Sequence, residues 1–348
     1  MTTATTISTG SNGGGPLRVL YSFPTRIGVP GIGTTAWHQV AGLVAAGCRV
    51  TVFCGSCEKP IPGVHRVVQT MRCAGLRIPY RLLGDDRAFQ FHDGQVARAL
   101  RREPGAFDVV HGWPLGSLET LRAARDAGVT CFLERPNAHT RFAYDVVARE
   151  HERIGLPVPP THTHAFNAAR LAREEAEYAL ADKLLCPSEF VARTFATNGF
   201  AASSLARHQY GYSPDAFSPR GPHRDGAPFT VLSVGRCEPR KGLHYALDAW
   251  HESGAAAAGG RFIICGNFVP GYREFLRPQL CHPSVEERGF VTNVDAAMRE
   301  ADVVVVPSIE EGSALVTYEA RGTGCVLLAS SAAGAIGEDG TEILLHEP

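Results

Sequence analysis

The chain has 348 residues, of which 44% are hydrophobic and 20% are charged, which is typical of a soluble globular protein long enough for two domains. Its 34 basic and 35 acidic residues give a net charge of -1. No overall electrostatic attraction therefore draws the chain to nucleic acid or to an anionic membrane, and an anion-binding site would have to be local.

The first 16 residues, MTTATTISTGSNGGGP, are polar and rich in glycine. They lack the basic start and the apolar segment of a secretory signal, so we predict a disordered tail. No apolar run approaches the roughly 20 residues that a membrane-spanning helix needs. We therefore expect a cytoplasmic protein whose ten cysteines are mostly buried thiols.

Cys54 and Cys57 have C-x-x-C spacing in FCGSCEKP. As zinc ligands they would need a second such pair, which the sequence lacks. As a redox pair they would open a helix, whereas Pro60 and Pro62 predict a loop. We interpret the two cysteines as structural thiols.

Short apolar strands alternate with amphipathic helices between residues 17 and 209. The expected strands cover 17–23, 48–55, 107–113, 129–134 and 183–188. The expected helices cover 34–47, 116–128, 139–155, 165–183 and 189–199.

The segment 210–228, YGYSPDAFSPRGPHRDGAP, breaks this periodicity and predicts a linker because it is rich in proline and glycine. The alternation restarts at 229 with FTVLSVG and continues to the end. Near-continuous apolar strands between helices predict an α/β protein with two doubly wound parallel sheets. We thus expect a tail (1–16), a first domain (17–209), the linker, and a second domain (229–348), with ligands in a cleft at the carboxyl ends of the strands.

Arg236 and Lys241 stand in VGRCEPRKG, between an expected strand and a helix that starts near Gly242. A loop that leads into a helix N-terminus favours anions through its free N–H groups and the helix dipole. Two cations there would hold a diphosphate and stabilise it as it leaves. The alternative is a solvated loop in which Glu238 is an incidental partner.

Glu311 and Glu319 are separated by seven small or apolar residues in PSIEEGSALVTYEARGTG. With Ser313 as N-cap, a helix would start at Ala314 and leave Glu311 in the preceding loop. Glu319 would then lie in the second turn on an apolar face, where a carboxylate is costly unless it is hydrogen-bonded.

The two hydroxyls of a ribose would satisfy Glu319, and the hydroxyls of a sugar would suit Glu311. The neighbouring Glu310 is expected to be solvated. The alternative is that all of these glutamates are ordinary charges at the edge of a helix.

These motifs in order, GRCEPRKG, then GF at 289–290, then PSIEEGSALVTYEARGTG, resemble the donor-binding half of family 4 glycosyltransferases, which have the GT-B fold of two Rossmann-like domains. Upstream, VPGIGTTAWHQVAGLVAAGCRVTVF resembles the first glycine loop and helix of that family. ADKLLCPSEFV resembles its last N-domain strand, and GYSPDAFSP its interdomain segment. The resemblance covers nearly all of 17–348 and is most specific in the C-terminal motifs.

The resemblance implies a retaining enzyme that transfers a sugar from a nucleotide diphosphate donor to a hydroxyl acceptor. Neither a cofactor nor a metal is expected, and the sequence contains no D-x-D triplet. Arg236 and Lys241 would bind the diphosphate, Glu319 the ribose, and Glu311 the transferred sugar as a catalytic residue. The other implied donor-binding residues are Gly31, Gly33, Phe290, Gly312, Ser313, Ala314 and Leu315.

Two departures from the family pattern stand out. Ser313 and Ala314 replace the usual Phe-Gly, which alters the turn at the sugar. The usual N-domain histidine has no obvious match, so we take His139, in CFLERPNAHT, as the second catalytic candidate and His111 as the next choice. Each of these histidines also fits a purely structural role.

Two other functions remain open. The chain would be a non-catalytic nucleotide-sugar-binding relative if the altered N-domain histidine abolishes turnover. GIGTTA also satisfies the G-x-G-x-x-A fingerprint of NAD-dependent oxidoreductases, with Glu58 some 25 residues further on. That fingerprint needs its first glycine at the end of the strand, whereas PTRIGVP intervenes, so this third function is the least favoured.

The acceptor, whether a glycan, a lipid-linked sugar or a small molecule, is not evident from the sequence. The arginine-rich stretch 74–103 favours a solvated helix face, with an anionic acceptor or peripheral membrane contact as the alternative. Family members continue beyond the equivalent of Pro348. We therefore expect a C-terminally truncated chain that is less stable and less active than a longer version.

Overall fold

The computed structural model describes residues 15–73, 76–77, 84–221 and 226–347, so most of the predicted tail lies outside the described residues. The chain divides into two compact units. The first unit comprises 1–133 and 176–182, and the second comprises 134–175 and 183–348. The domain boundaries expected from the sequence stay a prediction.

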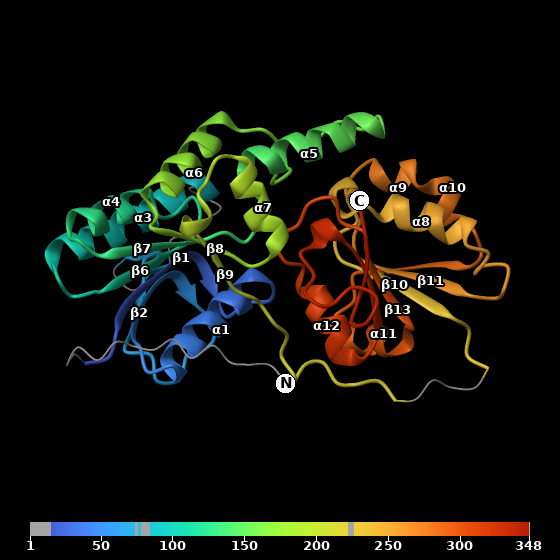
Figure 1. Ribbon diagram of the computed structural model, residues 1–348, viewed down its shortest axis with the longest axis horizontal. Coiled ribbons are helices and arrows are strands. Elements are labelled where there is room, and N and C mark those ends of the chain that lie inside the picture. Colours follow the sequence, from blue (N-terminus) through green and yellow to red (C-terminus); the bar gives the residue numbers. More distant parts are fainter. Residues whose placement is uncertain (1–14, 74–75, 78–83, 222–225, 348) are drawn as a thin grey trace. The chain divides into compact units, whose positions relative to one another are not determined.

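The first sheet has seven strands in the order β3-β2-β1-β6-β7-β8-β9. Its strands are β1 (Arg18–Ile27), β2 (Arg49–Cys57), β3 (Arg66–Gln69), β6 (Val109–Gly112), β7 (Thr130–Glu134), β8 (Lys183–Cys186) and β9 (Leu205–Arg207). The helices of this half are α1 (Ile32–Ala45), α3 (Asp85–Arg102), α4 (Leu118–Asp126), α5 (Thr140–Arg153), α6 (Ala168–Leu180) and α7 (Glu189–Thr197). Figure 1 shows α1 on one side of the first sheet and α3 with α4 on the other.

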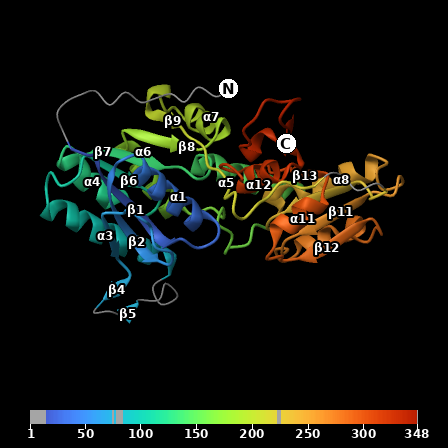
Figure 2. The same cartoon turned by 90° about the horizontal axis from the view of Figure 1, so that it is seen from below.

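The interior of β2 is buried along both of its faces, as a strand covered by helices on both sides requires. Val50, Val52 and Cys54 belong to one core cluster with Ala36 and Val40 of α1. The alternate residues of β2 face the opposite side of the sheet, toward α3. A short antiparallel pair, β4 (Arg72–Cys73) and β5 (Leu76–Arg77), follows β3 and extends away from the sheet (Figure 2).

The second sheet has six strands in the order β12-β11-β10-β13-β14-β15. They are β10 (Thr230–Val234), β11 (Arg261–Cys265), β12 (Val285–Gly289), β13 (Val303–Val306), β14 (Val326–Ser330) and β15 (Leu344–His346). Its helices are α8 (Leu243–Glu252), α9 (Tyr272–Phe275), α10 (Arg277–Leu280), α11 (Val294–Glu300) and α12 (Leu315–Thr323).

Two apolar clusters form the core around this sheet. One includes Leu232, Ile263 and Val304, and the other includes Val231, Phe262 and Val305. Neighbouring residues of one strand thus belong to different clusters, because successive side chains point to opposite faces. Neighbouring strands pair in parallel within the described part of both sheets, so the predicted α/β class with two Rossmann-like doubly wound sheets is confirmed.

The sequence did not predict β3, β4, β5, β9 or β15, all of which have four residues or fewer. The predicted strand 48–55 contains Cys54, and β2 continues two residues further, to Cys57, whereas Pro60 and Pro62 lie in a loop as predicted. An i, i+3 spacing in a strand places the two side chains on opposite faces, which does not suit a joint metal or redox site. Both thiols are free, and burial raises the pKa of Cys54 well above its ordinary value.

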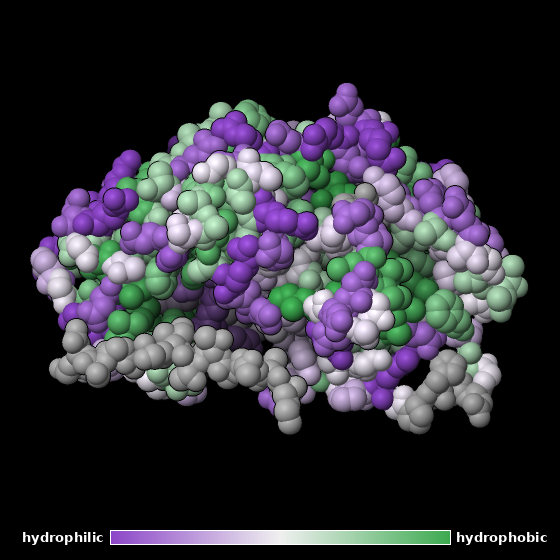
Figure 3. All heavy atoms as spheres, in the orientation of Figure 1, coloured by the Kyte–Doolittle hydropathy of each residue, from purple (hydrophilic) through white to green (hydrophobic). Residues whose placement is uncertain are grey.

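No helix in the described part of the chain is long and apolar enough to cross a bilayer. Figure 3 shows hydrophilic and hydrophobic residues mixed on the visible face of each unit. Such a mixed surface is normal for a globular protein.

Candidate functional site

The order of strands in the second sheet reverses between β10 and β13, which are neighbours although β11 and β12 lie between them in the sequence. The loops that leave the carboxyl ends of these two strands therefore meet at one edge of the sheet. The first loop contains Arg236 and Lys241 and ends at Gly242, which adopts φ 68° before α8. The second loop contains Glu311 and Gly312 and leads into α12.

The two loops meet through Lys241 and Glu311. The Lys241 ammonium is in direct contact with the Glu311 carboxylate. Burial, and then the charge of Arg240, lower the pKa of Lys241 to about 7, whereas a carboxylate partner opposes such a shift. Two of the predicted site residues are thus brought together as an ion pair.

Arg240 is the centre of this charge cluster, although its position next to Lys241 did not single it out in the sequence. Its Nε lies 3.0 Å from Oε1 of Glu238, and its Nη1 lies 3.2 Å from Oε2 of Glu310 and 3.3 Å from Oε2 of Glu311. Arg240 also donates a 2.9 Å hydrogen bond to the backbone carbonyl of Glu310. The buried Arg240 guanidinium thus connects the loop after β10 to the loop after β13.

Glu310 was predicted to be solvated, and this was wrong. Its side chain is fully buried, pairs with Arg240, and accepts a 3.2 Å hydrogen bond from the backbone N–H of Ala138. His164 Nε2 lies 3.4 Å from Glu310 Oε2. Although burial opposes the charge, His164 and then Arg240 lower the pKa of Glu310, and burial lowers the pKa of His164 to about 4.

His162 belongs to the same cluster, with Nε2 3.3 Å from Oε2 of Glu238. Burial raises the pKa of Glu238, but the hydrogen bond with His162 and then the charge of Arg240 outweigh this effect and lower it to about 2. No motif or fixed spacing connects the THTH segment to Glu238 and Glu310. Only the fold could reveal this buried network.

The turn that carries the sugar-binding candidates is held by close backbone packing. A Cβ atom at Gly312 would lie 1.5 Å from the carbonyl oxygen of Pro136, and the Gly312 carbonyl accepts a 2.6 Å hydrogen bond from Ser188. The predicted N-cap was off by one residue: Ala314 is the N-cap, and the helix begins at Leu315. The hydroxyl of Ser313 instead lies 2.8 Å from the hydroxyl of Tyr318.

Arg236 lines a pocket of about 480 Å³ together with Phe290. Its side chain is 58% exposed, with Nε 3.4 Å from Oε2 of Glu238, and is therefore accessible to a ligand. Phe290 is 73% exposed although it is a large apolar side chain. The other residues that line the pocket are Val234, Gly235, Cys265, Gly266, Asn267, Phe268, Val269, Pro270, Val291 and Val294.

Glu319 lies in the second turn of α12, as predicted, and is partly buried. Burial raises the pKa of its carboxyl to about 7. It does not line the pocket of Arg236 and Phe290, so the structure does not bring Glu319 and Arg236 into one described cavity. Its role toward a ribose stays a prediction.

His139 precedes α5 as its N-cap residue and is only 3% exposed. Its ring packs against Phe195 and Phe200 at centroid distances of 5.0 and 6.0 Å, and burial lowers its pKa to about 4. This environment favours the structural role over contact with substrate. The second choice, His111 at the end of β6, is also buried and lies 4.6 Å from the ring of Tyr21.

Gly31 and Gly33 belong to the first unit, where Gly31 is the N-cap of α1 with φ 82°. A Cβ atom at Gly33 would lie 2.4 Å from the carbonyl oxygen of Arg26, so the local packing alone requires glycine there. Their predicted role toward a diphosphate is not tested by this packing. No group of three or more metal-ligating side chains occurs in the described ranges.

The sequence matches the family described as "Glycosyltransferase Family 4" over residues 29–215, which is more than half of the chain. The chain belongs to this family. Residues 228–348 match the description "Glycosyl transferases group 1", so both halves of this family 4 protein match glycosyltransferase sequences.

Solved glycosyltransferase structures share its fold, which confirms the predicted GT-B architecture. Anabaena HepE in complex with UDP is 16% identical, with a TM-score of 0.60 over 95% of this chain and 86% of HepE. The lipopolysaccharide outer core galactosyltransferase WaaB is 15% identical, with a TM-score of 0.59 over the same shares of the two chains.

A curated relative is WcaL of Escherichia coli (strain K12), which is named as a colanic acid biosynthesis glycosyltransferase. It is 26% identical to this chain over 163 residues. This match covers 44% of the present chain and 40% of WcaL. The family 4 chain therefore matches less than half the length of this relative.

Proposed function

We propose that this protein is a retaining glycosyltransferase that transfers a sugar from a nucleotide diphosphate sugar to a hydroxyl acceptor. The contact between Lys241 and Glu311 at the β10/β13 edge carries the proposal. A diphosphate entering this edge would compete with Glu311 for Lys241, and the released Glu311 carboxylate would accept hydrogen bonds from the hydroxyls of the sugar.

The pocket beside Arg236 supports a site for the nucleotide base. Phe290 offers an exposed aromatic face at this pocket. Any nucleotide base can stack on such a face, because every base has a flat π surface. Arg236 at the same pocket would hold the adjacent phosphate. A volume of about 480 Å³ is within the range of small-molecule sites.

In the proposed reaction, the acceptor oxygen forms a bond to the anomeric carbon while the bond from that carbon to the donor phosphate oxygen breaks. The proton of the acceptor hydroxyl passes to the departing phosphate on the same face of the sugar. Lys241 and Arg236 would stabilise the negative charge that develops on the diphosphate. The nucleotide diphosphate leaves with the transferred proton.

The decisive experiment incubates the full chain with UDP-, GDP- and ADP-sugars and a panel of hydroxyl acceptors. UDP-glucose is the first donor to try, because related HepE structures are described in complex with UDP and UDP-glucose. We expect release of nucleotide diphosphate that increases with acceptor and is much slower in Lys241→Ala. Transfer with inversion at the anomeric carbon would contradict the retaining assignment.

A non-catalytic nucleotide-sugar-binding protein is the second candidate. The observation that favours it is the burial of His139 behind Phe195 and Phe200, which leaves the N-domain histidine candidate away from solvent. Saturable binding of a nucleotide sugar without hydrolysis or transfer, across the whole acceptor panel, would favour this candidate.

A further inference from the structure

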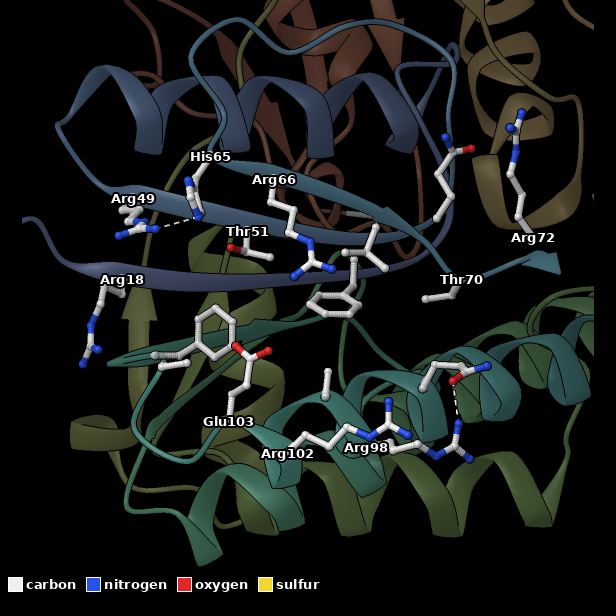
Figure 4. A pocket seen from close by; sticks show the side chains of 17 residues that line it. Arg18, Arg49, Thr51, His65, Arg66, Thr70, Arg72, Arg98, Arg102 and Glu103 are labelled. Atoms are coloured by element: carbon white, nitrogen blue, oxygen red, sulfur yellow. Dashed lines mark hydrogen bonds between the residues drawn. The ribbon is translucent and has the colours of Figure 1, made fainter. Parts of the chain in front are cut away.

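A second pocket, of about 580 Å³, lies within the first unit between the sheet and α3 (Figure 4). Strands β1, β2 and β3 form one wall, and α3 with the segment after it forms the other. Its lining includes six arginines but a single carboxylate, Glu103. The six arginines are Arg18, Arg49, Arg66, Arg72, Arg98 and Arg102.

The strand wall gathers its arginines through the register of the sheet. Arg18 of β1 pairs in register with Arg49 of β2, and Arg66 of β3 pairs with Thr51 of β2. Because residues two apart in a strand share a face, Arg49 and Thr51 lie on one side of β2. Three neighbouring strands therefore place an arginine at their amino-terminal ends on the same face of the sheet.

The helix wall contributes Arg98 and Arg102, which are four residues apart and lie on one face of α3. Figure 4 shows these two side chains and Arg66, from opposite walls, extending into the space between sheet and helix. Gln95 accepts a 2.6 Å hydrogen bond from Arg98 Nη1, which orients the guanidinium without neutralising it. Like charges at this spacing destabilise a helix unless an opposite charge is present.

The protein supplies little opposite charge of its own. Arg18 is paired with Asp108 at 2.6 Å, and Arg49 Nη2 lies 2.8 Å from Nε2 of His65, which is no anion. Within the described ranges, the structure shows no ion pair between a carboxylate and Arg66, Arg98 or Arg102. Several cations thus converge on one concave space with a net positive charge.

The lining also includes the apolar residues Phe53, Val68 and Phe107. Thr51 and Thr70 add hydroxyl groups on the strand side. A lining that combines apolar and cationic side chains suits a ligand that has a carbon body and charged substituents. Planar guanidinium groups fit phosphate oxygens through paired hydrogen bonds, and several of them match a multiply charged ligand.

We propose that this pocket binds an organic phosphate ester with at least two negative charges, as a second ligand site of the protein. It shares no residue with the proposed donor site, whose Lys241, Arg236 and Glu311 lie in the second unit. The proposal therefore goes beyond the sugar transfer and does not depend on it. Two sources fit the chemistry: a free metabolite and the headgroup of an anionic lipid.

The test uses the full chain at physiological salt and has two arms. Isothermal titration calorimetry with fructose 1,6-bisphosphate measures binding of a free ester. Sedimentation with phosphatidylcholine vesicles, with and without phosphatidic acid, measures binding of a lipid headgroup. We expect saturable binding in at least one arm, and the responding arm identifies the source of the phosphate.

The variant Arg66→Ala/Arg98→Ala removes one cation from each wall, and we expect it to weaken the responding interaction at least about tenfold. Two controls should bind as the wild type does. Arg101→Ala removes an exposed arginine of the same helix that does not line the pocket, and Lys241→Ala impairs only the proposed donor site. Arg66→Ala/Arg98→Ala should retain the donor turnover of the wild type. Turnover therefore tests the proposed function, whereas binding of the phosphate ester or vesicles tests this pocket.

Three results would overturn the proposal. These are no saturable binding in either arm, equal affinity in Arg66→Ala/Arg98→Ala, or an equal loss in Lys241→Ala. Hydrogen exchange of the wild type gives an answer even if the double variant does not fold. Fructose 1,6-bisphosphate or the vesicles should slow exchange in residues 49–70 and 85–102, and an unchanged pattern in both segments would again overturn the site.

Discussion

The ammonium group of Lys241 is in direct contact with the carboxylate of Glu311, although the two residues lie in loops after different strands. The contact exists because β10 and β13 are neighbours at the point where the order of strands reverses. In the absence of a ligand, the cation proposed for the diphosphate and the acid proposed for the sugar thus neutralise each other. Donor binding would exchange this internal pair for two contacts with the substrate.

Lys241→Ala is expected to lower kcat/KM for the donor by about 10- to 100-fold, because a charge-assisted hydrogen bond contributes about 1.5–3 kcal/mol. Lys241→Arg keeps the charge and should retain part of the activity. Initial rates of nucleotide diphosphate release over a range of donor concentrations measure both effects. Wild-type kcat/KM in Lys241→Ala would remove this lysine from the donor site.

Arg236→Ala is expected to weaken binding of a nucleoside diphosphate by about 1.5–3 kcal/mol, again the range of a charge-assisted hydrogen bond. The same substitution should reduce the affinity for a nucleoside monophosphate less, because this ligand lacks the second phosphate. Calorimetry with UDP and UMP compares the two losses. Arg277→Ala, an exposed arginine of the same unit, is the matched control, and an equal effect of both substitutions would indicate a loss of general charge rather than of a specific contact.

The fold was largely predictable because long apolar strands and amphipathic helices carry strong periodic signals. β2 and β13, for example, are runs of mostly buried residues with flanking helices. Short edge strands such as β3 and β15 carry no such signal, since three or four residues do not establish an alternation. The predicted strand 48–55 ended two residues early, because Gly55 is a weak strand former although β2 continues through it to Cys57.

The candidate site was predictable only where a motif exists. The motifs that contain Arg236, Lys241, Glu311 and Glu319 predicted a donor site, and the fold brings Lys241 and Glu311 of this set into contact. Arg240, Glu310 and the histidines of THTH were missed because their association depends on long-range packing, which no local pattern encodes. The adjacent Glu310 and Glu311 have side chains that are 0% and 15% exposed, and charge alone does not predict which of the two is fully buried.

Glu319 should make stability depend on pH. Its folded pKa is raised from 4.5 to about 7 by burial, so between these values the folded protein retains a proton that the unfolded chain releases. Its contribution is therefore fully present below pH 4.5 and is lost as pH rises through 7, with a slope of at most about 1.4 kcal/mol per pH unit. Urea unfolding of the wild type and of Glu319→Gln between pH 4.5 and 8 measures the difference.

The same titration should affect nucleotide binding in the opposite sense. If ribose hydroxyls donate to the Glu319 carboxylate, the ionised form binds, and affinity for UDP should fall as pH decreases below 7. In Glu319→Gln this part of the pH dependence should disappear. Parallel pH profiles for the two proteins, in both stability and affinity, would contradict the raised pKa.

Glu310→Ala should destabilise the fold by about 3–5 kcal/mol, because it leaves the Arg240 guanidinium buried without one of its carboxylate partners. The double variant Arg240→Met/Glu310→Met removes both charges and should recover much of that loss. Urea unfolding of the wild type, Arg240→Met, Glu310→Met and the double variant gives the coupling energy. Additive losses would mean that the two side chains do not stabilise each other.

Gly312→Ala tests whether the turn that we propose to bind the sugar needs its close backbone packing. The added Cβ would lie 1.5 Å from the carbonyl oxygen of Pro136, so the turn or its neighbour must move. We expect a loss of about 1–3 kcal/mol in stability, the range for overpacking, together with lower turnover, because the displaced loop carries Glu311. Gly94→Ala in α3 is the matched control: its Cβ would meet no atom within 4 Å, and alanine at a helix interior should stabilise by roughly 0.5–1 kcal/mol. An unfolding midpoint and a turnover in Gly312→Ala equal to those of the wild type would show that the turn adjusts freely, and the rigid placement of Glu311 by this packing would then be wrong.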